Sequence, residues 1–270
     1  MKKVLTLLVF MGVITLQSNA KDISTYLYAG LQSASSVKDK LISKQFDIIG
    51  EYDAMGDSNY HVIVYTNSEL KELASLTNRG FAAVLKVMIS QNENQIVFTN
   101  SEYFLHAFLQ NEYKKDVADN INNKLVSLFG ELKPSLDALD DKDISDYHFS
   151  FGMPYYEDMD ILAQGNNLKT LIRKNATNNL VFELQLNHST LFGISMLTEN
   201  GEHSFLSKIE GEKHAVYLPY MILVEDNKAK ILPAKYYMSV AFPKLSFGEF
   251  MSIASTPDDI NSYLELLFKK

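Results

Sequence analysis

Two hairpin-like segments at a constant spacing constrain the fold of this sequence more than any other feature. In each, an apolar run leads into four polar residues and a second apolar run, at 83–99 and at 215–232. A shift of 133 residues places 82–104 on 215–237 without a gap, with six identities in 23 positions. Average composition gives about one or two identities over such a length. The match predicts two related units in one chain; the alternative is two unrelated hairpins in one larger sheet.

The identical positions fall in both strands of the hairpin, in its turn and just beyond it. They are Ala82/Ala215, Leu85/Leu218, Met88/Met221, Ile89/Ile222, Asn94/Asn227 and Tyr103/Tyr236. Because a one-residue slip turns every strand side chain to the other face of a sheet, a gapless match predicts the same buried face in both hairpins.

The patterns around the hairpins predict an α+β fold of two similar units, each a small, mostly antiparallel sheet with helices packed on it. Further strand patterns lie at 23–29, 46–52, 60–65, 147–153, 180–186 and 191–197. Cap signals and apolar stripes predict helices at 36–45, from Thr66, over 104–109, 117–129 and 246–253, and from Thr256, which would cap a helix with Pro257 at its first position.

An aspartate-rich segment separates the two units. Residues 136–146 hold five aspartates and follow Pro134, which is typical of a solvated linker. The predicted units are therefore 21–135 and 147–270. A calcium loop would need a glycine at its sharp turn and a glutamate at its twelfth position. Here the glycine is missing and the twelfth position from Asp141 is Gly152, so we expect no metal site.

The first twenty residues have the three zones of a secretory signal peptide. Lys2 and Lys3 precede an apolar run at 4–16, and Ser18-Asn19-Ala20 ends the segment. The run is shorter than the roughly 18 residues of a membrane-spanning helix. Cleavage after Ala20 would give a periplasmic or secreted protein; the alternatives are an uncleaved anchor and a buried helix. No later segment has the length and apolarity of a membrane span.

Composition excludes several classes of function. Removing residues 1–20 takes away two of the 25 basic residues and none of the 33 acidic ones, which leaves 23 − 33 = −10. A chain this acidic is unsuited to nucleic acid or anionic lipid, which need a basic face. Without cysteines there is no disulfide, thiol nucleophile or zinc–thiolate site.

The second hairpin resembles a known family. Residues 218–227, Leu-Pro-Tyr-Met-Ile-Leu-Val-Glu-Asp-Asn, are similar to the Leu-Pro-Cys, apolar strand and acidic turn of domain of unknown function family 302. Asn67-Ser68-Glu69-Leu70 occupies the place of that family's Asn-Pro-Glu-Leu, without the proline. The family's cysteine is Tyr220 in one unit and Val87 in the other, and Lys86 stands where the second unit has Pro219. The resemblance implies an α+β fold in tandem, divergent copies, and no established activity.

No catalytic, metal or cofactor motif stands out. The six histidines lack the i, i+4 spacing of a helical metal site, and Gly193-Ile194-Ser195 lacks the second glycine of a nucleophile elbow. Tyrosines near the hairpins and the junction offer an apolar body and a polar tip, which suits a ligand or partner surface. These ligand-binding candidates are Tyr103, Tyr155, Tyr156, Tyr220 and Tyr236; the alternative for each is ordinary core packing.

We therefore expect a non-enzymatic periplasmic protein that binds a small molecule or an envelope protein, built as a pseudo-dimer within one chain. Fusing two copies fixes their interface, and ligand clefts often lie between such units. A rival hypothesis is a hydrolase that uses the carboxylates between Glu157 and Asp160, since paired acids can transfer protons. A third is an envelope-complex subunit that acts by interaction alone.

Overall fold

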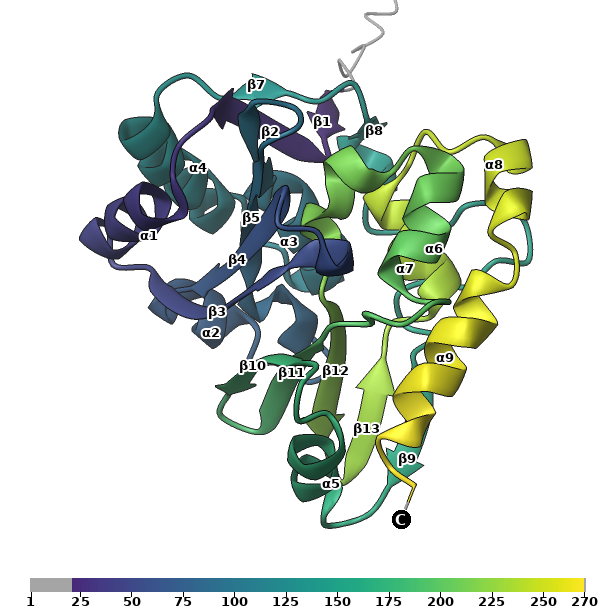
Figure 1. Ribbon diagram of the computed structural model, residues 1–270. Helices are drawn as coiled ribbons and strands as arrows, with labels where there is room; N and C mark the ends of the chain where they lie inside the picture. Colours follow the sequence, from purple (N-terminus) through teal and green to yellow (C-terminus); the bar gives the residue numbers. More distant parts are fainter. Residues whose placement is uncertain (1–20, 270) are drawn as a thin grey trace, which may run out of the picture.

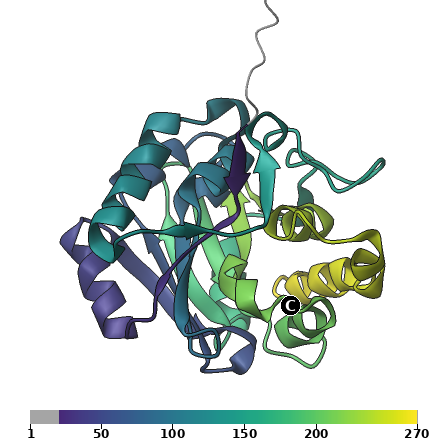
Figure 2. The same ribbon diagram turned by 90° about the horizontal axis from the view of Figure 1, so that it is seen from above.

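A computed structural model describes residues 21–269; the predicted signal peptide at 1–20 lies outside the described residues. Two large antiparallel sheets lie one beside the other with helices around them (Figure 1), and a small two-stranded sheet adds to them, so the α+β class is confirmed. Seen from above, α1 and α4 cover one side of the molecule and α6 to α9 the other, with the strands between them (Figure 2). We call 21–135 the first unit and 147–269 the second.

The first unit is built around a six-stranded sheet with the order β3-β4-β5-β6-β2-β7. Its strands are β2 (Tyr26–Gly30), β3 (Asp47–Asp53), β4 (Tyr60–Thr66), β5 (Leu85–Ser90), β6 (Gln95–Thr99) and β7 (Lys133–Pro134). Its helices are α1 (Ala34–Ser43), α2 (Ser68–Leu73), the 3-10 helix η2 (Gly80–Ala83), α3 (Ser101–Leu109) and α4 (Lys115–Phe129).

The second unit is built around a five-stranded sheet with the order β10-β11-β12-β13-β9. Its strands are β9 (Asp160–Gln164), β10 (Leu180–Gln185), β11 (Ser189–Ile194), β12 (Tyr220–Glu225) and β13 (Lys228–Ile231). Its helices are α5 (Leu168–Asn175), α6 (Glu202–Leu206), the 3-10 helix η6 (Glu212–Tyr217), α7 (Ala234–Ala241), α8 (Phe247–Ser252) and α9 (Thr256–Leu266).

The two sheets share one strand order. The first five strands of the first sheet, β3-β4-β5-β6-β2, match the second sheet, β10-β11-β12-β13-β9, strand for strand in chain order. The first sheet has one strand more, β7, beside β2. Helices follow the same plan, because α3 follows the first hairpin as α7 follows the second, and a 3-10 helix precedes each hairpin. Helix α4 follows α3 in the first unit, whereas in the second unit α8 stands between α7 and α9.

The hairpins differ in their turns. Ser90 pairs with Gln95 across a four-residue turn, whereas Glu225 pairs with Lys228 across Asp226 and Asn227. Both of these turn residues have positive φ, 49° and 57°, as a two-residue turn of the primed type requires. Strand β12 therefore continues two residues further than the gapless shift implies. A displacement of two residues keeps the same side chains on the buried face.

The segment expected as a solvated linker is partly ordered in a small sheet. Residues Ala138–Asp140 form β8, which pairs antiparallel with β1 (Asp22–Ser24). The strand expected over 23–29 is therefore two strands, separated at Thr25. Its first part leaves the main sheet to pair with the aspartate-rich segment, and its second part pairs with β6.

Three expectations in the second unit are corrected. Residues 147–153 form no strand, and the edge strand β9 begins instead at Asp160. Residues 215–217 belong to the 3-10 helix η6 rather than to the hairpin. Ser255 occupies the N-cap position of the last helix without a side-chain hydrogen bond, so Thr256 is its first residue and Pro257 its second. By contrast, Ser246 caps its helix as expected and forms a capping box with Glu249. In the first unit, the helix expected from Ser36 begins at Ala34, with Ser33 as its N-cap.

Candidate ligand-binding cleft

Two of the predicted ligand-binding tyrosines join the units instead. Tyr103 on α3 donates its hydroxyl to the carbonyl of Val240 at 2.9 Å, and Tyr236 on α7 donates to the carbonyl of Ala107 at 3.1 Å. Both side chains are fully buried, and burial raises the pKa of each phenol well above its usual range. Because both hydroxyls are buried and already donate to backbone carbonyls, they are not accessible to a ligand.

Two more of the predicted tyrosines are also buried. The Tyr220 hydroxyl donates to the carbonyl of Leu232 at 2.9 Å, within the second unit. The Tyr156 hydroxyl donates to the carbonyl of Asn78, and the guanidinium of Arg79 lies 5.2 Å from the centre of its ring. Tyr156 therefore ties the loop before β9 to the first unit. Tyr220 and Tyr156 therefore pack in the core, which is the alternative that the sequence also allowed.

Tyr155 is the predicted tyrosine that faces open space. It is 44% exposed and lines a cleft of about 680 Å³ at the edge of the second unit. Such a volume lies within the range of about 300–1,000 Å³ that is usual for small-molecule sites. The cleft is lined by His148, Phe151, Gly152, Met153, Pro154, Tyr155, Asp158, Asp160, Pro233, Ala234, Lys235, Pro257, Asp258 and Asn261.

Three segments form the walls of this cleft. The loop 148–158 supplies an apolar wall with Phe151, Met153 and Tyr155. The starts of α7 and α9 supply the opposite side, with Lys235 and Asp258. Figure 1 shows α9 running down the side of the second sheet, next to β9. The cleft is therefore formed where two helix starts meet the loop that leads into the edge strand.

The carboxylates of the hydrolase hypothesis are divided between different contacts. Glu157 forms an ion pair with Arg79 at 2.7 Å and is not among the cleft residues. Asp158 and Asp160 do line the cleft; Asp158 accepts from the Tyr155 backbone N–H at 3.0 Å, and Asp160 from Asn261 Nδ2 at 3.1 Å. The cleft thus brings together two of the three acids, and no serine or threonine is among the residues that line it.

The cleft is acidic with apolar walls. Three aspartates and one lysine line it, and within residues 21–269 neither Asp258 nor Lys235 forms an ion pair. The amide oxygen Oδ1 of Asn261 is buried without a hydrogen-bond partner in the same range. Unpaired charged groups beside exposed aromatic side chains are typical of a surface that receives a polar ligand with an apolar part.

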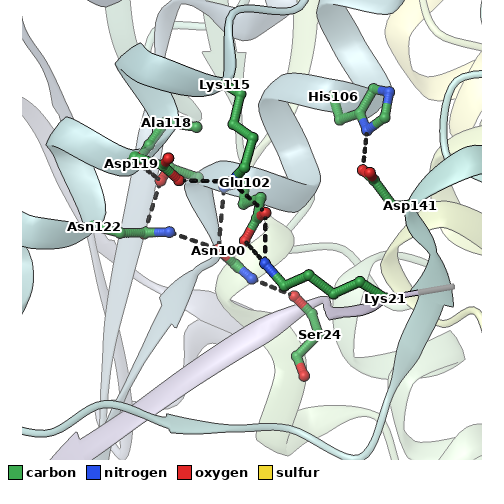
Figure 3. Close-up of polar contacts among 11 residues, drawn as sticks. Lys21, Ser24, Asn100, Glu102, His106, Lys115, Ala118, Asp119, Asn122 and Asp141 are labelled. Atoms are coloured by element: carbon green, nitrogen blue, oxygen red, sulfur yellow. Dashed lines mark hydrogen bonds and ion pairs between the residues drawn. The ribbon is translucent and has the colours of Figure 1, made fainter. Parts of the chain in front are cut away.

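The corresponding place in the first unit is filled by side chains (Figure 3). Lys21 and Lys115 both reach Glu102, each at 2.9 Å, and Lys115 also contacts Asp119 at 2.8 Å. Asn122 bonds to Asn100 at 3.3 Å. These residues come from the starts of α3 and α4 and from the segment before β2, as the cleft residues come from the starts of α7 and α9 and the segment before β9.

A buried lysine and a buried glutamate lie away from the cleft. Lys86 Nζ donates to the carbonyls of Tyr217 and Pro219 and to the Tyr237 hydroxyl, and burial lowers the pKa of its ammonium to about 7. Glu202 accepts from the backbone N–H of Met55 at 2.8 Å, and burial raises its pKa. Both reach across the units. The cavity beside Lys86, of about 10 Å³, is no larger than one water needs, so this lysine joins the units rather than binding a ligand.

The sequence predicts helix α9, but its part in the cleft and its likeness to α4 were missed. Residues 118–125, Ala-Asp-Asn-Ile-Asn-Asn-Lys-Leu, align with 257–264, Pro-Asp-Asp-Ile-Asn-Ser-Tyr-Leu, at a shift of 139. The signal was present in the sequence but lies six residues out of step with the hairpin shift of 133, because the second unit carries extra residues around α8. Pro257, Asp258 and Asn261 are the cleft residues within this alignment.

No family model, no curated protein and no solved structure matches the chain. The resemblance to domain of unknown function family 302 is therefore carried by its motif residues alone. Within residues 21–269, no group of three or more histidine, aspartate or glutamate side chains is placed to hold a metal ion. In the same range, no helix has the length and apolarity that crossing a membrane requires.

Proposed function

We propose that this protein is an exported binding protein that holds a small molecule in the cleft between loop 148–158 and the starts of α7 and α9. The observation that carries the proposal is the cleft itself. Its volume suits a small molecule, and its walls combine exposed aromatic side chains with charged groups that lack partners among residues 21–269. A few polar groups set in an apolar wall are what fixes the orientation of a ligand.

Binding fits the cleft better than hydrolysis does. A hydrolytic site needs a positioned base within hydrogen-bond reach of a nucleophile or of an attacking water. Asp160 accepts a hydrogen bond from the Asn261 amide and Asp158 accepts one from a backbone N–H, so both carboxylates already have a donor within the protein. Glu157 is held by Arg79, outside the cleft. Carboxylates held in this way can attract a charged ligand, but they are not placed as a free base for hydrolysis.

We further propose that the two units descend from one by duplication and form a pseudo-dimer within the chain. The shared strand order supports this proposal, as do the two tyrosine contacts. Tyr103 and Tyr236 are 133 residues apart, and so are their acceptors, Ala107 and Val240. In a two-fold interface residue i contacts j while the copy of i contacts the copy of j, and these two bonds have that relationship.

Native mass spectrometry of the protein purified from the exported fraction tests the binding function. We expect a retained small molecule in the wild type. It should be lost in Met153→Trp, which fills the cleft from its loop, and kept in Met251→Trp, which adds the same bulk on the exposed face of α8. Retention in both variants would place the ligand elsewhere. A bare protein mass, together with turnover of ester or glycoside substrates that Asp158→Asn abolishes, would favour the hydrolase instead.

A further inference from the structure

The first unit contains a filled counterpart of the cleft. The starts of α3 and α7 correspond at the shift of 133, so Asn100, Ser101 and Glu102 stand where the second unit has Pro233, Ala234 and Lys235. The starts of α4 and α9 correspond at the shift of 139, so Asp119 and Asn122 stand where it has Asp258 and Asn261. All five of these second-unit residues line the cleft.

Strands β2 and β9 also correspond, although β2 is flanked by β7 and β9 lies at the edge of its sheet. Leu27 on β2 pairs with Phe98 on β6, and Asp160 on β9 pairs with Ile231 on β13. Adding 133 to both residues of the first pair gives the second pair. The same shift places Pro154, a cleft residue, where the first unit has Lys21. The starts of α3 and α4 and Lys21 therefore surround the polar cluster in Figure 3, where the starts of α7 and α9 and Pro154 line the cleft.

In the first unit, two lysine ammonium groups neutralise the acids at this place. Lys21 and Lys115 both form ion pairs with Glu102, and Lys115 forms another with Asp119. Two positive charges are thus balanced by two negative charges. Figure 3 shows both lysine side chains extending toward Glu102 from opposite sides. The cluster is charge-balanced and its space is occupied by the protein's own side chains.

In the second unit one of the two acids is kept, the other is replaced by Lys235, and the counterparts of the two lysines carry no ammonium group. Asp258 stands where the first unit has Asp119, whereas Pro154 and Ala254 stand where it has Lys21 and Lys115. The loop and edge strand add Asp158 and Asp160, and Lys235 is the lysine that lines the cleft. Three aspartates against one lysine leave an excess of two negative charges, in a space that two long basic side chains fill in the other unit.

We propose that the cleft binds a small organic diammonium ion, one ammonium of which lies on Asp258 as the Lys115 ammonium lies on Asp119. The inference rests on the binding function proposed above and names its ligand class. The second ammonium lies toward Asp158 and Asp160. The aliphatic chain between them packs on Met153 and Tyr155, and the face of the Tyr155 ring is suited to a cation.

Isothermal titration with putrescine tests the proposal, with butanediol and succinate as the matched neutral and anionic probes. We expect saturable binding of putrescine, and binding of the other two to be at least tenfold weaker. Asp258→Asn should weaken putrescine binding by roughly tenfold, as expected for loss of a hydrogen bond to a charged group. Asp259→Asn is the control, because Asp259 is the next residue in the same exposed helical turn but does not line the cleft.

Other outcomes separate the two proposals. Tighter binding of succinate than of putrescine, lost in Met153→Trp, would overturn the diammonium inference and leave the binding function standing. Equal weakening in Asp258→Asn and Asp259→Asn would show general charge attraction rather than a site, and would also overturn the inference. Failure of every probe, with no retained mass in native spectra of the wild type, would overturn both.

Discussion

Tyr103 and Tyr236 each donate a hydroxyl to the helix that carries the other, Tyr103 to Val240 on α7 and Tyr236 to Ala107 on α3. The exchange couples the two units through a pair of buried bonds rather than through an exposed contact. Because both phenols are buried, each hydroxyl would be left without a partner if the units separated, at a cost of about 1–3 kcal/mol per group. The two units are therefore expected to unfold together.

Removing these hydroxyls should destabilise the protein unequally. The carbonyl of Ala107 also accepts from Gln110 Nε2 and keeps that partner when Tyr236 is changed. We expect Tyr103→Phe to lower the free energy of unfolding by about 1–2 kcal/mol and Tyr236→Phe by less. Tyr113→Phe is the control, since the Tyr113 hydroxyl is buried without a partner within residues 21–269. Urea denaturation measures all three; a Tyr113→Phe cost as large as that of Tyr103→Phe would contradict the interpretation.

Lys86 should make stability rise with pH above neutrality. Burial depresses the pKa of its ammonium in the folded state to about 7, below the value of about 10.4 in the unfolded chain. Between these values the unfolded state binds more protons, so the free energy of unfolding increases with pH, by at most about 1.4 kcal/mol per unit. The nearby charge of Glu202 opposes part of this shift in the pKa of Lys86.

The contribution of Lys86 is isolated by comparison with Lys86→Met. Subtracting the stability of the variant from that of the wild type should give a difference that grows as pH is raised from about 7 to 9, below the range in which tyrosines ionise. Guanidinium denaturation at several pH values measures this difference. A difference that stays constant over that range would mean that Lys86 remains charged, held by its bonds to Tyr217, Pro219 and Tyr237.

Export should produce a chain that begins at Lys21. Within the described residues Lys21 is already held, because its carbonyl accepts from the backbone N–H of Asp141 at 3.0 Å and its ammonium lies on Glu102. Cleavage after Ala20 would therefore leave a first residue that belongs to the fold. Intact mass of the exported protein measures this, and a membrane-bound form that retains residues 1–20 would contradict it.

The alternation of strands and helices could be predicted wherever one face of an element is buried. Both hairpins follow from their apolar runs and polar turns, and α4 follows from the stripe of Ile121 and Leu125. The pairing of β1 with β8 could not be predicted, because an aspartate-rich segment gives no apolar alternation. Strand β9 is half-exposed at a sheet edge, and so its pattern was weak.

The cleft was only partly predictable for a related reason. Tyr155 and the acids at 158 and 160 were candidates because their residue types suit a site, and they do line it. Residue type could not separate Tyr155 from Tyr156, its neighbour, which is buried against the first unit. Which of two adjacent side chains faces a cleft depends on the path of a loop, and that path is fixed by tertiary contacts such as the one between Tyr156 and Asn78.

The last prediction concerns one hydroxyl that the first unit has and the second lacks. Ser101 Oγ donates to Asn122 Oδ1 at 2.7 Å and lies 3.0 Å from the carbonyl of Ala118. Its counterpart is Ala234, and the corresponding amide oxygen, Asn261 Oδ1, is buried without a partner within residues 21–269. A buried polar atom that lacks a hydrogen bond costs about 1–3 kcal/mol.

Ser101→Ala and Ala234→Ser should therefore have opposite effects. The first leaves Asn122 Oδ1 without its donor and should lower the free energy of unfolding by about 1–2 kcal/mol. The second supplies a donor to Asn261 Oδ1 and should raise it by about 0.5–1.5 kcal/mol. Ala107→Ser is the control, because Ala107 is also buried in a helix, α3, but is not the counterpart of a residue that donates to an unpaired acceptor. If Ala234→Ser destabilised the protein as much as Ala107→Ser does, the starts of α3 and α7 would not be equivalent, and the template for the cleft ligand would lose its basis.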